Sequence, residues 1–187
     1  MKTEGPPPDW DALYETAAAQ AGYFTLGDAI AAGFSAPLLQ YHCGGRIERA
    51  GRGIFRLRHY PVMEQEDLVP IWLWAGKAGV FSHETALQLH GLSDVLPAHH
   101  YLTVPASWRR RRLRVPPGVT LAFRDYEQGE VEWHGPVPVT SPLRTLLDSL
   151  EAHVLPDLWE AALHQAVERG LVARSEAESL RKRAASS

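Results

Sequence analysis

The sequence is poor in cysteine and in long apolar runs, and each absence excludes a class of protein. Cys43 is the single cysteine among 187 residues, so an internal disulfide framework and a cysteine-rich zinc site are excluded. No apolar run approaches the roughly 18 residues that a membrane-spanning helix needs. Residues 1–10 lack the charged, apolar and small-residue regions of a secretory signal. We therefore expect a soluble cytoplasmic protein.

Familiar catalytic motifs are also missing from the sequence. It contains no phosphate-cradling glycine loop, no G-x-S-x-G, no H-E-x-x-H and no acid–acid–lysine grouping typical of nucleases. His83 and His90 are seven residues apart, which does not fit the i,i+4 spacing of paired metal ligands on a helix. We therefore expect a non-enzyme without metal or cofactor. One alternative stays open, a nucleic-acid-processing enzyme that uses the His83–Glu84 region.

Positive charge is concentrated in one short segment of a chain whose net charge is −3. Between residues 33 and 60 there are five arginines and one acid, whereas acids gather at 64–67 and 125–132. A locally basic module on an acidic chain is typical of contact with a polyanion such as DNA.

The first 60 residues read as three helices followed by a hairpin. Asp9 is placed to cap a helix that reaches about residue 20, and Thr25 and Ser35 are placed to cap two short ones. Strands at 46–50 and 54–58 flank the turn Gly51-Arg52-Gly53. This order predicts a winged helix-turn-helix.

The remaining sequence predicts a mixed α+β domain. Helices are expected at 64–77, after Ser82, after Thr140 or Ser141, from Pro156 and after Ser175; strands are expected near 80, at 100–105, 119–125, 129–133 and 136–139. Two prolines should confine the last strand to a sheet edge or make it irregular. The predicted fold class is thus α+β, with a disordered lead-in at 1–8, a DNA-binding domain at 9–60, a boundary at Pro61 and a C-terminal α+β domain at 62–187.

In this arrangement the third helix would read base edges and the hairpin would contact the DNA backbone or the minor groove. Leu38 and Leu39 should pack inward. The predicted DNA-binding residues are Ser35, Gln40, Tyr41, His42, Arg46, Arg49, Arg52, Arg56 and Arg58. The alternative is that these arginines only solvate an exposed hairpin. The helix carries no lysine or arginine before Arg46, which favours paired binding on an inverted repeat.

A second basic patch lies in the C-terminal region. It consists of Arg109, Arg110, Arg111, Arg112 and Arg114. It could contact phosphates or an acidic partner, or it could be a solvated loop, as charge runs usually are. Farther along, Arg144 and Asp148 have the i,i+4 spacing of an ion pair along a helix.

Several stretches in order resemble the AbiEi-type antitoxins of type IV toxin–antitoxin systems. They are GYFTLGDAIAAGFS, GGRIERAGRGIFRL, SHETALQLHGLSD, YLTVP and VPVTSPLRTLLD, and the resemblance spans roughly residues 10–170. It implies an N-terminal winged helix that binds inverted repeats upstream of its own operon and represses it. It also implies a C-terminal domain that counteracts a nucleotidyltransferase-like toxin without requiring a stable complex. His83, Glu84, Arg144, Thr145 and Asp148 match family-pattern positions for which no role is implied.

The sequence therefore predicts a DNA-binding transcriptional repressor that is also the antitoxin of a type IV pair. Its expected partners are double-stranded DNA and a nucleotidyltransferase-like toxin, with no membrane involved. A stand-alone winged-helix regulator with a partner- or effector-sensing C-terminal domain is the alternative.

Overall fold

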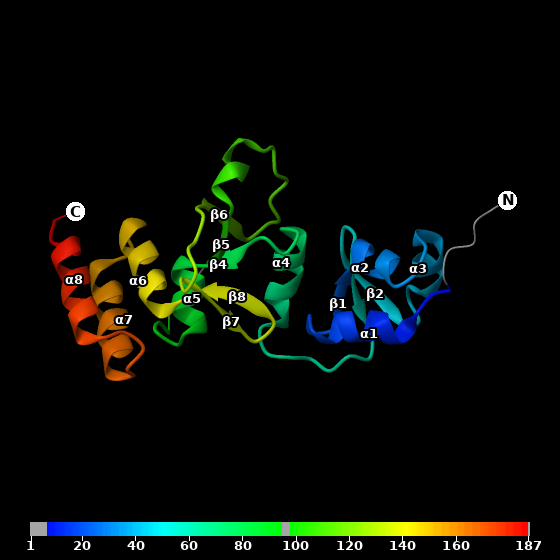
Figure 1. Ribbon diagram of the computed structural model, residues 1–187, viewed down its shortest axis with the longest axis horizontal. Coiled ribbons are helices and arrows are strands. Elements are labelled where there is room, and N and C mark those ends of the chain that lie inside the picture. The colour runs from blue at the N-terminus through cyan, green and yellow to red at the C-terminus, as the bar shows by residue number, and fades with distance from the viewer. Residues whose placement is uncertain (1–6, 95–97, 187) are drawn as a thin grey trace. The chain divides into compact units, whose positions relative to one another are not determined.

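The computed structural model describes residues 7–94 and 98–186 and is an α+β protein with two compact units (Figure 1). Unit 1 extends to Lys77 and includes Gly135–Val137, and unit 2 contains Ala78–His134 and the chain from Pro138 onward. Residues 1–6 of the predicted lead-in lie outside the described residues. No helix in the described part of the chain is both long and apolar enough to cross a membrane.

Three capped helices open unit 1, where the sequence predicts them. They are α1 (Trp10–Ala18), α2 (Leu26–Ala31) and α3 (Ala36–His42). The Asp9 carboxylate accepts hydrogen bonds from two backbone N–H groups of α1. Thr25 and Asp28 form a reciprocal capping box on α2, and the Ser35 hydroxyl accepts from the Leu38 N–H. These bonds satisfy N–H groups that a helix start leaves without a partner, and they fix the three helix starts.

A three-stranded antiparallel sheet completes the first part of unit 1. Its order is β1-β3-β2, with β1 at Tyr23–Thr25, β2 at Ile47–Gly51 and β3 at Ile54–Leu57. The predicted hairpin is confirmed as β2 and β3. Strand β1 was not predicted, because three residues are too few to show an alternating pattern.

The core of this part lies between the helices and the sheet. The rings of Phe24 and Phe55 stack with centroids 5.7 Å apart. Leu39 is fully buried and Leu38 packs against the same core, as the sequence predicts. The other large buried members are Leu13, Phe34 and Ile47.

Unit 1 continues past the predicted boundary at Pro61. A short 3₁₀ helix, η1 (Glu66–Leu68), leads into α4 (Val69–Trp74), which packs against β1 and β3. Arg56 pairs with Glu66 at 2.9 Å, and Lys77 pairs with Asp28 at 3.0 Å. The first compact unit therefore ends at Lys77, because these contacts attach residues 62–77 to the preceding elements.

Unit 2 is built on a five-stranded mixed sheet in the order β6-β5-β4-β8-β7. The strands are β4 (Val80–Phe81), β5 (His100–Val104), β6 (Val119–Phe123), β7 (Val131–His134) and β8 (Val137–Thr140). The expectation of an edge position for the proline-containing strand is wrong, since β8 lies between β4 and β7. The sheet tolerates Pro138 there because β4 is only two residues long and pairs with β8 at Val139.

Four helices accompany this sheet: α5 (His83–Leu89), α6 (Pro142–Glu151), α7 (Pro156–Glu168) and α8 (Arg174–Ala184). Their apolar faces form one cluster, in which the Trp159 indole N–H donates to the Leu146 carbonyl at 2.9 Å. Ser82 is the N-cap residue of α5, as predicted, although its side chain makes no capping hydrogen bond. The predicted cap at Ser175 is wrong, because Ala173, one position before Arg174, occupies the N-cap of α8.

Candidate functional site

The exposed side of α3 holds two of the four polar residues that the sequence predicts to read bases. Gln40 is exposed, and Tyr41 is 81% exposed. Ser35 is also exposed, but its hydroxyl is used as the helix cap. His42 is half-buried and packs edge-on against the Trp10 ring, with centroids 4.9 Å apart. Gln40 and Tyr41 are therefore the α3 side chains best placed to meet a ligand.

Three of the predicted arginines present their charge to solvent. Arg49 lies on β2, and Arg52 lies at the hairpin tip, where Gly53 adopts a φ of +73°. Neither forms an ion pair among the residues that the structure describes. Arg46 is exposed as well, and its guanidinium lies 5.2 Å from the centroid of Trp10. The Trp10 ring orients this arginine while its N–H groups remain available.

The other two predicted arginines are occupied within unit 1. Arg58 pairs with Glu48 at 3.1 Å and donates to the Gly44 carbonyl. Arg56 has a side chain only 12% exposed, because β3 is the central strand and the segment leading to Glu66 covers this part of it. Its guanidinium pairs with Glu66, donates to the Tyr60 carbonyl at 3.1 Å and lies over the Tyr23 ring. The Arg56 guanidinium is therefore largely covered and engaged within unit 1, unlike those of Arg46, Arg49 and Arg52.

In unit 2 two distant sequence motifs meet in one group of buried and half-buried polar residues, which we call the Asp148 cluster. Its members are Ser82, His83, Thr103, Tyr126, Arg144 and Asp148. Arg144 donates to one Asp148 carboxylate oxygen from Nε at 3.0 Å and from Nη2 at 2.7 Å, which confirms the predicted ion pair. The pair is buried, and Glu130 approaches Arg144 at 3.4 Å.

A chain of hydrogen bonds runs from this ion pair to His83. The Tyr126 hydroxyl lies 2.8 Å from Asp148 Oδ2 and 3.0 Å from Thr103 Oγ1. Thr103 Oγ1 lies 2.7 Å from Ser82 Oγ, which lies 2.8 Å from His83 Nδ1. Each hydroxyl has one proton, and a carboxylate can only accept. All four contacts can be hydrogen bonds at the same time only if Tyr126 donates to Asp148 and Thr103 donates to Tyr126. Ser82 must then donate to Thr103, and the His83 Nδ1–H must donate to Ser82.

This order of donors defines what the cluster can do chemically. Burial, and next the charge of Asp148, raise the pKa of Tyr126, so the phenol keeps the proton that it donates. Burial lowers the pKa of His83, so its ring is neutral at pH 7 and carries its proton on Nδ1. Nε2 is then left as a hydrogen-bond acceptor or base. Ser82 is fully buried and therefore cannot act as a nucleophile on a substrate.

The backbone at His83 has the strained geometry often found at functional positions. Its φ is +53°, and its ring stacks on Tyr101 with centroids 5.3 Å apart. Within the part of the chain that the structure describes, Glu84 makes no hydrogen bond to the cluster, and Thr145 instead pairs with Thr140 at 2.7 Å. Within residues 7–94 and 98–186 no three histidine, cysteine or acidic side chains gather as metal ligands.

The members Tyr126, Thr103 and Ser82 were not predicted as site residues. Each is an isolated polar residue, and only the folded sheet and α6 bring them to Asp148. The one signal in the sequence was the Arg144–Asp148 spacing, which indicates a pair but not its burial.

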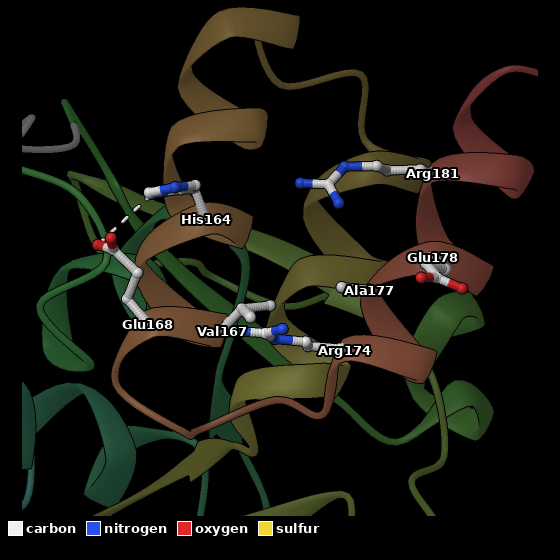
Figure 2. A pocket seen from close by; sticks show the side chains of 7 residues that line it. All are labelled: His164, Val167, Glu168, Arg174, Ala177, Glu178 and Arg181. Carbon is white, nitrogen blue, oxygen red and sulfur yellow. Dashed lines mark ion pairs between the residues drawn. The ribbon is translucent and has the colours of Figure 1, made fainter.

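A cleft of about 620 Å³ lies between α7 and α8 (Figure 2). Charged side chains of both signs line it, and His164 pairs there with Glu168 at 3.5 Å. Arg181 pairs with Glu160 on α7. The cleft contains none of the predicted site residues, and these exposed ion pairs give it the character of an ordinary surface.

The second basic patch surrounds the end of a 3₁₀ helix, η2 (Ala106–Arg110), between β5 and β6. All five of its arginines are exposed. The guanidinium of Arg111 lies 4.5 Å from the Trp108 ring centroid, and that of Arg109 lies 5.9 Å from the Phe123 centroid.

Comparison with known proteins gives a distant likeness of fold. No family model matches the chain, and no curated protein matches it. A solved structure, the RV2827C protein from Mycobacterium tuberculosis, aligns with 12% sequence identity and a TM-score of 0.46. The alignment covers 95% of this chain and 83% of that one.

Proposed function

We propose that this protein is a DNA-binding transcriptional repressor whose first 60 residues form a winged helix-turn-helix. The observation that carries the proposal is the arrangement in unit 1. There α2, a glycine turn and α3 precede a hairpin, and exposed side chains of α3 occur together with unpaired arginines of the hairpin. Helices of this kind enter the major groove, while a hairpin can contact the adjacent backbone or minor groove.

Of the nine predicted DNA-binding residues, we propose that five contact DNA. Gln40 and Tyr41 are the proposed base-reading residues, and Arg46, Arg49 and Arg52 are the proposed phosphate-binding residues. One copy with so few cations would bind weakly, because each phosphate contact adds a roughly equal step of affinity. We therefore propose that two copies bind an inverted repeat upstream of the protein's own operon.

We further propose that unit 2 serves as the antitoxin domain of a type IV pair, against a nucleotidyltransferase-like toxin. The support is the resemblance of its motifs, SHETALQLHGLSD and VPVTSPLRTLLD, to those of AbiEi-type antitoxins. The structure adds that Ser82 and His83 of the first motif and Arg144 and Asp148 of the second belong to one cluster. A stand-alone regulator remains the alternative.

The Arg49→Ala/Arg52→Ala double variant tests the DNA contact. We expect it to weaken operator binding and to reduce the slope of log K against log salt by about 2, because two phosphate contacts are lost. Binding of the chain to its upstream DNA is measured by fluorescence anisotropy between about 50 and 200 mM salt. An unchanged slope would contradict the assignment of these two arginines.

Arg56→Ala is the control within the same unit. It removes one charge, yet we expect the salt slope to stay unchanged and the free energy of unfolding to fall by about 1–3 kcal/mol, because Glu66 loses its cationic partner and keeps, among the described residues, only the hydrogen bond from the Met63 N–H. A reduced salt slope with an unchanged free energy of unfolding would show instead that Arg56 contacts DNA.

Co-expression with the product of the adjacent gene tests the antitoxin proposal. If that gene encodes a growth-arresting nucleotidyltransferase-like protein, we expect the full chain to restore growth and the Arg49→Ala/Arg52→Ala variant, expressed from a foreign promoter, to restore it equally. The reason is that repression and antitoxicity are assigned to different units. Operator binding without rescue would favour the stand-alone regulator.

A further inference from the structure

The loop between β5 and β6 carries a second, separate concentration of positive charge. We call residues 106–118 the arginine loop. Figure 1 shows it projecting beyond the end of the sheet of unit 2. No aspartate or glutamate occurs between Asp94 and Asp125 in the sequence. A net charge of −3 for the whole chain thus conceals a segment of 30 residues without any acid.

The charge of this loop is not neutralised by the fold. None of its arginines makes an ion pair with a carboxylate in the part of the chain that the structure describes. Three arginines of α6 and α8 behave differently, since Arg144, Arg181 and Arg183 all have carboxylate partners. An arginine whose only role is to keep a surface soluble is stabilised by a nearby acidic side chain. Five arginines without such a partner produce a positive potential that favours binding of an anionic ligand.

The loop is also held in place. The Arg111 N–H donates to the Trp108 carbonyl at 2.8 Å, and the Leu113 N–H donates to the Arg111 carbonyl at 3.1 Å. The Ala106 N–H donates to the Asp125 carboxylate at 3.1 Å. Arg111 lies over Trp108, and stacking of this kind holds the guanidinium plane while its edge N–H groups stay available. Less side-chain entropy is then lost when a ligand binds.

We propose that the arginine loop binds the phosphate backbone of a nucleic acid. The charged residues are all arginine, whose planar donors match phosphate oxygens in a two-pronged geometry. The loop has little apolar surface of the kind that anchors a protein partner: Leu113 is half-buried and Val115 is the one exposed large hydrophobic residue. The proposal gives unit 2 a nucleic-acid contact of its own, independent of operator recognition by unit 1.

The experiment uses the full chain carrying Arg49→Ala and Arg52→Ala, so that two of the proposed phosphate contacts of unit 1 are already removed. The loop variant adds Arg112→Ala and Arg114→Ala to this background, because both arginines are exposed and neither stacks on an aromatic ring of the described residues. The matched control places Arg174→Ala and Lys182→Ala, which remove the same charge from α8. The probes are a random-sequence DNA duplex and a single-stranded RNA of equal length, measured by anisotropy. Circular dichroism verifies that all variants are folded.

We expect the loop variant to bind at least one probe on the order of tenfold more weakly near 0.1 M salt, with the duplex slope reduced by about 2. The α8 control should bind as the background does. The weakened probe then identifies the source of the phosphate as DNA or RNA. Unchanged affinity for both probes would overturn the proposal, and so would an equal loss in the control. Displacement of the duplex by polyglutamate at equal charge concentration would assign the loop to an acidic protein instead.

The test of operator binding and the test of the arginine loop give separate results. Failure of the first test bears on the proposed repressor, and failure of the second bears on the arginine loop. Each proposal can therefore fail while the other stands.

Discussion

Replacing Gly22 by alanine is expected to lower the free energy of unfolding of unit 1 by about 2–5 kcal/mol, because a strained backbone and an overpacked site act together. Gly22 adopts a φ of +87°, a region that disfavours a side chain. A Cβ atom at this position would lie 2.6 Å from Cγ and 2.7 Å from Cβ of Tyr60. These atoms are at the base of the Tyr60 side chain, so a rotation of its far end cannot relieve the overlap.

The surroundings of Gly22 allow little adjustment. Its N–H donates to the Ala17 carbonyl at 2.7 Å, and its carbonyl accepts from the Leu57 N–H at 2.9 Å, so the residue connects the end of α1 to β3. The Tyr60 hydroxyl in turn donates to the Ala18 carbonyl at 3.2 Å. Moving Tyr60 away would break this bond.

Gly53→Ala is the matched control for this prediction. Gly53 also has a positive φ, +73°, but a Cβ there would meet no atom within 4 Å. We expect it to cost about 1–2 kcal/mol, which is the backbone contribution alone. Urea unfolding gives both values, and hydrogen exchange of peptides from residues 10–60 places the loss in unit 1. Equal effects of the two variants would show that Tyr60 yields to the new methyl group.

The parts of the fold that the sequence predicts are those determined by local chemistry. Asp9, Thr25 and Ser35 cap α1, α2 and α3 because a cap needs only a side-chain oxygen and the next two or three N–H groups. The hairpin followed from the glycines on either side of Arg52. In each case the interacting atoms are close in the sequence.

The features that the sequence did not predict depend on residues far apart in the chain. Strand β1 exists because β3 offers it a free edge, and the position of β8 depends on the shortness of β4. Arg56 was grouped with the hairpin arginines because of its sequence neighbours, yet in the structure it pairs with Glu66, ten residues later. Tyr126 reaches Asp148 across 22 residues. No local pattern reports such contacts.

The second large effect is expected for Asp148→Ala in unit 2, which should lower the free energy of unfolding by about 3 kcal/mol. The carboxylate accepts two hydrogen bonds from Arg144 and one from Tyr126, and its side chain is 3% exposed. Removing it leaves a buried guanidinium without its main partner. The value lies at the low end of the range for a broken buried pair, because Glu130 and Glu151 remain within 3.4 and 3.6 Å of Arg144.

The double variant Arg144→Met/Asp148→Leu separates burial of an unpaired charge from loss of the pair itself. Replacing both charges by apolar groups removes the desolvation cost as well as the attraction, so we expect most of the loss in Asp148→Ala to be recovered. Urea unfolding followed by circular dichroism measures both, with hydrogen exchange of α6 peptides as the local readout. If the double variant is as unstable as Asp148→Ala, then the hydrogen bond from Tyr126 and the donor order that leads to His83 account for the stability, and the ion pair does not.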